Sequence, residues 1–183
     1  MSGYGINSEM ETQEVFKRAG MDSDIVHIND LIAGRKTLSD YRLLVFPGGF
    51  SYGDYLRTGA IARFSPIMNS VISFANKGGI VIGICNGFQI LLEAGLLPGA
   101  MMRNRGLKFV CDQIYVRTER TDTPFTNSLD EGKVIKLPIA HADGSYYIDG
   151  LGLKELEENR QVVLRYCSSN GDISDSVNPN GSL

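Results

Sequence analysis

Short apolar runs rich in β-branched and aromatic residues recur along the chain and predict strands. The runs lie at residues 24–28, 41–49, 80–84, 107–118, 133–141, 145–148 and 161–167. The run at 80–84 is continuously apolar, which is typical of a strand covered on both faces of a parallel sheet. The four later runs are separated by short predicted connections.

Helical signals fill the gaps between the first three runs. Residues 7–20 predict a helix with Asn7 or Ser8 as its N-cap, and residues 65–79 predict one with Ser65 as N-cap and Pro66 in the first helical position. Residues 86–99 begin a third helix directly after a strand. This alternation predicts an α/β fold, a flavodoxin-like open sheet with helices on both faces. We expect residues 1–183 to form one domain.

The two ends do not fit the pattern of a complete doubly wound domain. Such a domain begins with an apolar strand that lies inside the sheet, whereas Met1 leads almost directly into a loop. The tail at residues 168–183 is rich in turn residues and predicts no final element. We therefore expect a domain truncated at both ends, apparently lacking its first strand and its C-terminal element.

Composition narrows the classes of function. The chain has 183 residues, 43% of them hydrophobic and 21% charged, and a net charge of -3, which argues against nucleic acid and acidic lipid as partners. No apolar run approaches the roughly 20 residues of a membrane helix, and no signal peptide is evident. Three widely spaced cysteines predict neither a disulfide framework nor a metal site, so we expect a reducing, cytoplasmic location.

Candidate chemistry is concentrated in the segment VIGICNGFQI, residues 81–90. Gly83, Cys85 and Gly87 match the G-x-nucleophile-x-G elbow, a sharp strand-to-helix turn that strains the nucleophile and leaves no room for flanking side chains. The turn would expose the sulfur at the carboxyl end of the sheet, and the following helix would lower the pKa of the thiol. A small buried core cysteine is the alternative, but the strand before and the helix after favour the elbow.

A second glycine-rich turn follows the strand predicted at residues 41–49. Gly48 and Gly49 can uncover backbone N–H groups, which acyl transfer needs for the developing oxyanion. The amide of Asn86 and one amide from the turn ending at Phe50 form the expected donor pair. Taken alone, this turn would be an ordinary loop, and the absence of a following GK[ST] excludes a Walker phosphate loop.

Together these segments resemble class I, or triad-type, glutamine amidotransferases. The segments GYGIN, FPGGFSYGDYLRTGAIARFSPIM, GICNGFQILLEAGLLPGA and AHADG resemble, in this order, those of the glutaminase-subunit family of phosphoribosylformylglycinamidine synthase, a purine-biosynthesis enzyme. The resemblance covers essentially the whole chain. It implies that Cys85 attacks the amide of glutamine, releases ammonia and forms a glutamyl thioester that water hydrolyses.

The resemblance also implies roles for other residues and for partners. Gly49 and Asn86 would be the oxyanion donors. The residues that would shape the glutamine pocket are Gly48, Phe50 and Gln89, although Gln89 is equally compatible with a solvated helix face. The chain would need no cofactor or metal, and ammonia would pass to a synthetase subunit that uses ATP and Mg, with a small bridging subunit in the same complex.

Neither histidine of the chain is a clear catalytic base. His27 precedes the nucleophile and ends a predicted strand, so a structural role is expected. His141 follows the nucleophile and stands two residues before Asp143, but the family's His and Glu belong to a histidine-proline-glutamate motif that is not found here and is expected beyond Leu183. We expect His141 to line the glutamine pocket and leave open that it is the base.

Other interpretations remain open. A non-enzymatic stress or chaperone-like protein can carry an oxidisable elbow cysteine, although GGFSYGD together with Gln89 argues against it. A glutaminase can also serve another synthase, although GGFSYGDYLR argues against this. A module that docks without catalysis is a further alternative. Cys111 and Cys167 are expected to be packing residues. The basic segment RNRGLK, residues 103–108, is a solvated loop or a contact with substrate or synthetase.

Overall fold

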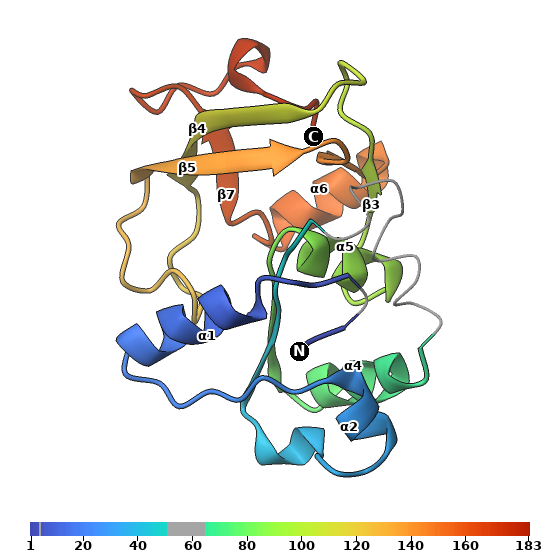
Figure 1. Ribbon diagram of the computed structural model, residues 1–183. Helices are drawn as coiled ribbons and strands as arrows, with labels where there is room; N and C mark the ends of the chain where they lie inside the picture. Colours follow the sequence, from blue (N-terminus) through green and yellow to red (C-terminus); the bar gives the residue numbers. More distant parts are fainter. Residues whose placement is uncertain (4, 51–64) are drawn as a thin grey trace. The chain divides into compact units, whose positions relative to one another are not determined.

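Two of the predicted strands pair in parallel in the computed structural model, which describes residues 1–3, 5–50 and 65–183 (Figure 1). β1 (Leu43–Phe46) and β2 (Ile80–Gly83) are in register from Leu43 opposite Ile80 to Phe46 opposite Gly83. Parallel pairing needs a crossover between the strands, and the helix predicted at residues 65–79 lies in that connection. The chain divides into two units, Met1–Pro98 and Gly99–Leu183, which are described in turn.

The first unit is completed by short helices around the strand pair. Its helical elements are α1 (Glu9–Arg18), α2 (Ile28–Ile32), the 3-10 turn η1 (Leu38–Asp40), α4 (Ile67–Asn76) and α5 (Asn86–Glu93). The apolar faces of α2, η1, α4 and α5, together with the strands, bury a cluster whose innermost members are Phe46, Val71 and Ile90. The cluster fixes α4 and α5 against the strands, and α5 begins directly after the end of β2. The α/β class predicted from the sequence is confirmed in this unit.

Four local predictions for this unit are wrong. Residues 24–28 form no strand, because they make only an isolated parallel bridge between His27 and Ser2, and α2 begins at Ile28. No side chain caps α1 at Ser8. β2 is partly exposed, with Ile80 at 38%, since β1 is the partner that the described residues provide for it. Helix α4 begins one residue later than predicted, and Ser65 Oγ accepts a hydrogen bond from the Ile67 amide at 3.4 Å.

The second unit is built on antiparallel strands, drawn in yellow-green to red in Figure 1. One sheet has the order β5–β4–β7, and β3 pairs with β6 in a second sheet. The strands are β3 (Ala100–Met102), β4 (Val110–Thr118), β5 (Val134–His141), β6 (Ser145–Tyr147) and β7 (Leu164–Cys167). Four of these were predicted, and Pro138 is tolerated in β5 because an edge strand leaves one backbone side unpaired.

One helix of this unit was missed. α6 (Gly150–Glu158) lies where the sequence predicted a short connection, and Asp149 caps it by accepting a hydrogen bond from the Gly152 amide at 2.7 Å. Two glycines in its first turn lower the helix propensity of this segment, so the sequence pattern did not indicate a helix here. The tail contains only the 3-10 turn η3 (Asp175–Val177), as its turn-rich composition predicted.

Candidate active site

Cys85 sits at the junction of β2 and α5 in a strained backbone conformation. Its φ is 55° and its ψ is -112°, a region that residues with a side chain rarely occupy. The thiol is exposed, and Cys85 is the N-cap residue of α5. The positive end of the helix dipole therefore stabilises a thiolate at this position. The predicted nucleophile elbow is confirmed in its backbone geometry.

The two flanking glycines are required by close contacts on either side of the turn. A Cβ atom at Gly83 would lie 2.6 Å from the carbonyl oxygen of Gly87 and 2.7 Å from Leu91 Cδ1. A Cβ atom at Gly87 would overlap the carbonyl oxygen of Phe46 at the end of β1. Helix α5 can thus approach the strand ends only because neither position carries a side chain.

The glycine-rich turn after β1 lies against the cysteine. A Cβ atom at Gly48 would stand 2.8 Å from Cys85 Cβ and 3.5 Å from Cys85 Sγ. Because the carboxyl ends of neighbouring parallel strands meet at one edge of the sheet, β1 and β2 deliver this turn and the thiol to the same place. The structure therefore brings together the two segments that the sequence singled out separately.

Asn7 holds this turn in place, a role that the sequence did not indicate. Asn7 Oδ1 accepts a hydrogen bond from the Phe50 amide at 3.0 Å, and the Asn7 and Ser8 amides donate to the Gly48 carbonyl at 3.2 and 3.1 Å. A Cβ atom at Gly49 would overlap Asn7. Asn7, which we predicted as a possible helix cap, instead holds the turn at residues 48–50 in place. The segment GIN, which contains Asn7 and belongs to the family resemblance, was the only sequence signal for this residue.

The braced turn leaves specific amides for an oxyanion. The Phe50 N–H is taken by Asn7, so this amide is not available as a donor. The Gly49 and Asn86 amides have no hydrogen-bond partner within residues 1–3, 5–50 and 65–183. These are the two donors that the resemblance implied.

Side chains at the start of α5 form a short polar chain from the sulfur. Cys85 Sγ lies 3.8 Å from Asn86 Oδ1, a weak S–H donor contact, and Asn86 Nδ2 donates to Gln89 Oε1 at 3.4 Å. Asn86 is buried, while Gln89 is half-buried one turn along the helix. Gln89 is therefore held by a hydrogen bond from Asn86 at the start of α5, which fixes an orientation that the sequence pattern left open.

The two histidines have structural partners. His27 is the N-cap residue of α2, and its Nδ1 accepts a hydrogen bond from the Asn29 amide at 3.1 Å, which agrees with the structural role predicted for it. In the second unit, His141 Nδ1 lies 3.0 Å from Asn104 Oδ1. Asn104 is 1% exposed and donates through Nδ2 to two carbonyls, so its Oδ1 is the acceptor and His141 Nδ1 carries the proton.

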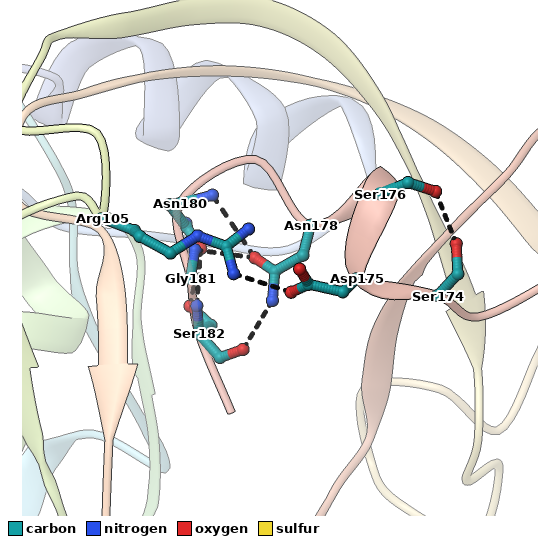
Figure 2. Close-up of polar contacts among 8 residues, drawn as sticks. All are labelled: Arg105, Ser174, Asp175, Ser176, Asn178, Asn180, Gly181 and Ser182. Atoms are coloured by element: carbon teal, nitrogen blue, oxygen red, sulfur yellow. Dashed lines mark hydrogen bonds and ion pairs between the residues drawn. The ribbon is translucent and has the colours of Figure 1, made fainter.

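The second ring nitrogen of His141 faces the tail of the chain. Asn180 Nδ2 lies 3.4 Å from His141 Nε2 and donates to the hydroxyl of Tyr166 at 3.1 Å, and burial raises the pKa of Tyr166. Figure 2 shows the tail turning back beside Arg105, whose amide donates to the Asn180 carbonyl at 2.8 Å. The two ring nitrogens of His141 thus each contact a buried asparagine, Asn104 at Nδ1 and Asn180 at Nε2.

We expect the Asn180 contacts to be a main source of stability in this unit. Asn180→Ala removes a buried side chain that makes hydrogen-bond contacts with His141, Tyr166 and Ser182. Because these groups then lose a partner in a buried setting, the free energy of unfolding should fall by about 3 kcal/mol. Urea unfolding measures this.

The matched control is Asp175→Ala, which removes the Arg105–Asp175 ion pair shown in Figure 2. Its side chains are 57% and 77% exposed, so the loss should stay below about 1 kcal/mol. Equal losses for the two variants would contradict the importance of the buried asparagine.

The other cysteines differ in environment. Cys167 is buried, as predicted for a packing residue, and its burial raises the pKa of the thiol. Cys111 is exposed, so the packing role predicted for it is wrong: it lies on a stretch of β4 whose neighbours are exposed. The described residues contain no group of three metal-ligating side chains and no helix long and apolar enough to cross a membrane.

The basic segment at residues 103–108 has identified partners. Arg103 Nε lies 3.6 Å from Asp143 Oδ1, and Arg105 pairs with Asp175 at 2.7 Å. The segment SYGDYLRTGAIARF, residues 51–64, which contributes much of the family signature, lies outside the described residues. The site is therefore built from residues 48–50, 85–89 and Asn7.

Comparison with known proteins places this geometry in a family. A family profile described as CobB/CobQ-like glutamine amidotransferase domain matches residues 1–183. The phosphoribosylformylglycinamidine synthase subunit PurQ of Moorella thermoacetica is 52% identical over 178 residues, covering 92% of this chain and 75% of the relative. The PurQ subunit of Gloeobacter violaceus is 54% identical over 178 residues, covering 92% and 77%. A chain in the structure of PurLQS from Thermotoga maritima aligns with TM-score 0.79 and 37% identity, covering 99% of this chain and 74% of that one.

Proposed function

The chain belongs to the CobB/CobQ-like glutamine amidotransferase family and is of the PurQ type, and from this premise we propose that Cys85 hydrolyses glutamine to supply ammonia to a synthetase. The reaction is that of the glutaminase subunit of phosphoribosylformylglycinamidine synthase in purine biosynthesis. The observation that carries the assignment of Cys85 is its exposed thiol, held at the N-terminus of α5 with the Gly48 backbone against it.

The chemistry follows from this arrangement. The sulfur attacks the side-chain carbonyl carbon of glutamine, the C=O electron pair moves onto the oxygen, and the Gly49 and Asn86 amides stabilise that oxyanion. Collapse breaks the C–N bond, and the nitrogen leaves as ammonia after gaining a proton. Water then adds to the thioester, and glutamate leaves with the sulfur restored.

Substrate contacts are proposed for the residues nearest the sulfur. Gly48 gives the substrate room to approach the thiol, Gln89 offers an oriented amide beside it, and Phe50 presents a 57% exposed ring at the end of the turn. His141 remains a proposed pocket residue, and we do not assign it as the base because its Nδ1 proton and its Nε2 are both directed at asparagines.

The partners proposed for this chain follow from its relatives. The matched structure is an assembly named PurLQS. We infer that the chain docks with a synthetase subunit and a small bridging subunit in the cytoplasm, and that ATP and Mg are used by the synthetase. The chain itself supplies ammonia without a cofactor, and the synthetase converts formylglycinamide ribonucleotide to formylglycinamidine ribonucleotide.

Amide-¹⁵N glutamine provides the direct test. The chain, mixed with the synthetase and bridging subunits of the same organism, should release ¹⁵N ammonia from glutamine and transfer ¹⁵N into the ribonucleotide product. Transfer from free ammonia but not from glutamine would reject the glutaminase assignment and favour a module that docks without catalysis.

The brace formed by Asn7 gives a second measurable expectation. Asn7→Ala frees the Phe50 amide and loosens the turn that carries Gly49, so kcat for glutamine should fall about tenfold while KM changes little. A loss of this size fits a positioning residue, since direct oxyanion donors are worth about 10²–10³.

The matched control is the neighbouring Ser8→Ala, whose side chain makes no cap hydrogen bond and whose amide contact is retained. It should keep kcat within about twofold of the starting value. A rise in KM with unchanged kcat for Asn7→Ala would show that the brace acts on substrate binding and not on the oxyanion.

A further inference from the structure

A groove of about 440 Å³ lies in the first unit between α4 and residues 36–39. Helix α4 contacts α2 (Figure 1) and η1. The floor of the groove is apolar and is formed by Leu31, Leu38, Ile67 and Phe74. Its volume is in the range of small-molecule sites, about 300–1,000 Å³. Among the described residues, those of the candidate active site at positions 7, 48–50 and 85–89 do not line it, so the groove is separate from that site.

The rim of the groove carries hydrogen-bond donors and positive charge. Its polar lining residues are Lys36, Thr37, Ser39, Asn69, Ser70, Ser73 and Lys77. No Asp or Glu is among the described residues that line the groove, and residues 65–92 contain neither residue type. A concave site that offers lysines and hydroxyls but no carboxylate favours an anionic ligand.

Lys77 is the cation of this rim that is available to an anion. It stands at the C-terminal end of α4, where the amides of residues 77–79 donate to the carbonyls of residues 73–75 at 2.9 to 3.2 Å. The helix end is therefore satisfied without the Lys77 ammonium group, which has no hydrogen bond or ion pair with any residue that the structure describes. Lys36, by contrast, already pairs with Asp24 at 3.0 Å.

Polar side chains on both walls are free to join Lys77. Ser73 lies one helical turn before Lys77, so the two residues share one face of α4. The side chains of Asn69, Ser70 and Ser73 make no hydrogen bond within the described part of the chain. On the other wall, residues 36–39 supply two further hydroxyls, which lie 3.0 Å apart. The groove thus combines an apolar floor, several uncommitted polar groups and one uncommitted cation.

We propose that this groove binds a nucleoside monophosphate. Lys77 and Ser73 would hold the phosphate through charge-assisted and hydroxyl hydrogen bonds. Asn69 and Ser70 offer polar groups for the ribose, and the apolar floor at Phe74 suits the flat face of a base. Among the described residues that line the groove, Lys77 is the one lysine without a partner, which matches a single phosphate group better than a triphosphate.

Isothermal titration calorimetry of the 183-residue chain with adenosine monophosphate tests the proposal. We expect saturable binding by the unsubstituted chain. Lys77→Gln should weaken this binding at least about tenfold, because the charge-assisted contact with the phosphate is lost. Adenosine, which lacks the phosphate, should bind the unsubstituted chain more weakly by a similar factor.

Lys17→Gln is the matched control, because Lys17 is also an exposed lysine at the C-terminal end of a helix, α1, but does not line the groove. It should keep the affinity for adenosine monophosphate within about twofold of the starting value. No saturable binding at millimolar adenosine monophosphate, equal affinity for adenosine, or equal affinity of the two variants would overturn the proposal. Because none of these measurements involves glutamine, such a result would leave the role proposed for Cys85 unchanged.

Discussion

Replacing Cys85 by serine should lower glutamine hydrolysis at least about 10³-fold, since a hydroxyl without a matched base is a poor nucleophile. The same change should abolish labelling by a glutamine analogue in which a diazoketone replaces the side-chain amide. Mass spectrometry of the intact chain should find one adduct on the unsubstituted chain and none on Cys85→Ser. The exposed thiol at the N-terminus of α5 is the physical reason for both outcomes.

The other two thiols supply controls for this experiment. Cys111 is exposed but occupies no helix N-terminus, so Cys111→Ser should keep both labelling and hydrolysis. Cys167 should stay unlabelled below its pKa, because burial raises that pKa and keeps the group as a thiol. Labelling that persists in Cys85→Ser would remove the basis for the proposed nucleophile.

Gly87→Ala should lower the free energy of unfolding by about 3 kcal/mol or more. The added Cβ would overlap the carbonyl oxygen of Phe46, and a methyl group has no rotamer that avoids the clash. Helix α5 would have to move away from β1 and take Cys85 with it. Urea unfolding measures the loss, and labelling of Cys85 reports the displacement.

Gly150→Ala is the control, because Gly150 also lies in the first turn of a helix and its Cβ would meet nothing within 4 Å. Alanine is the better helix former, so this change should be neutral or stabilising by up to about 1 kcal/mol. The two substitutions have the same chemistry and opposite expected signs. A stable Gly87→Ala protein would show that α5 does not need its close approach to the strand.

Features encoded within a few neighbouring residues were predictable from the sequence. Gly83, Cys85 and Gly87 specify the elbow by local sterics, and the strand before and helix after confirmed it. The α/β class followed in the same way from the alternation of apolar runs and helical segments.

Features that depend on distant contacts were not predictable. Asn7 braces an amide 43 residues away, and His141 is held by asparagines 37 and 39 residues away, so no short pattern reports either contact. Residues 24–28 have strand composition, but strand formation also depends on partners that composition does not reveal. Helix α6 was hidden because its capping by Asp149 offsets two glycines in its first turn.

The positive φ of Cys85 has a consequence for the thermal inactivation of the protein. Such a conformation costs on the order of 1–3 kcal/mol and persists only while the packing around it holds. When warming loosens that packing, we expect rotation of a single peptide unit to relax the elbow and turn the sulfur away before the rest of the fold unfolds. Loss of activity should therefore occur at a lower temperature than global unfolding. Titration of reactive thiols should detect the change while the circular dichroism signal of the secondary structure is still unchanged.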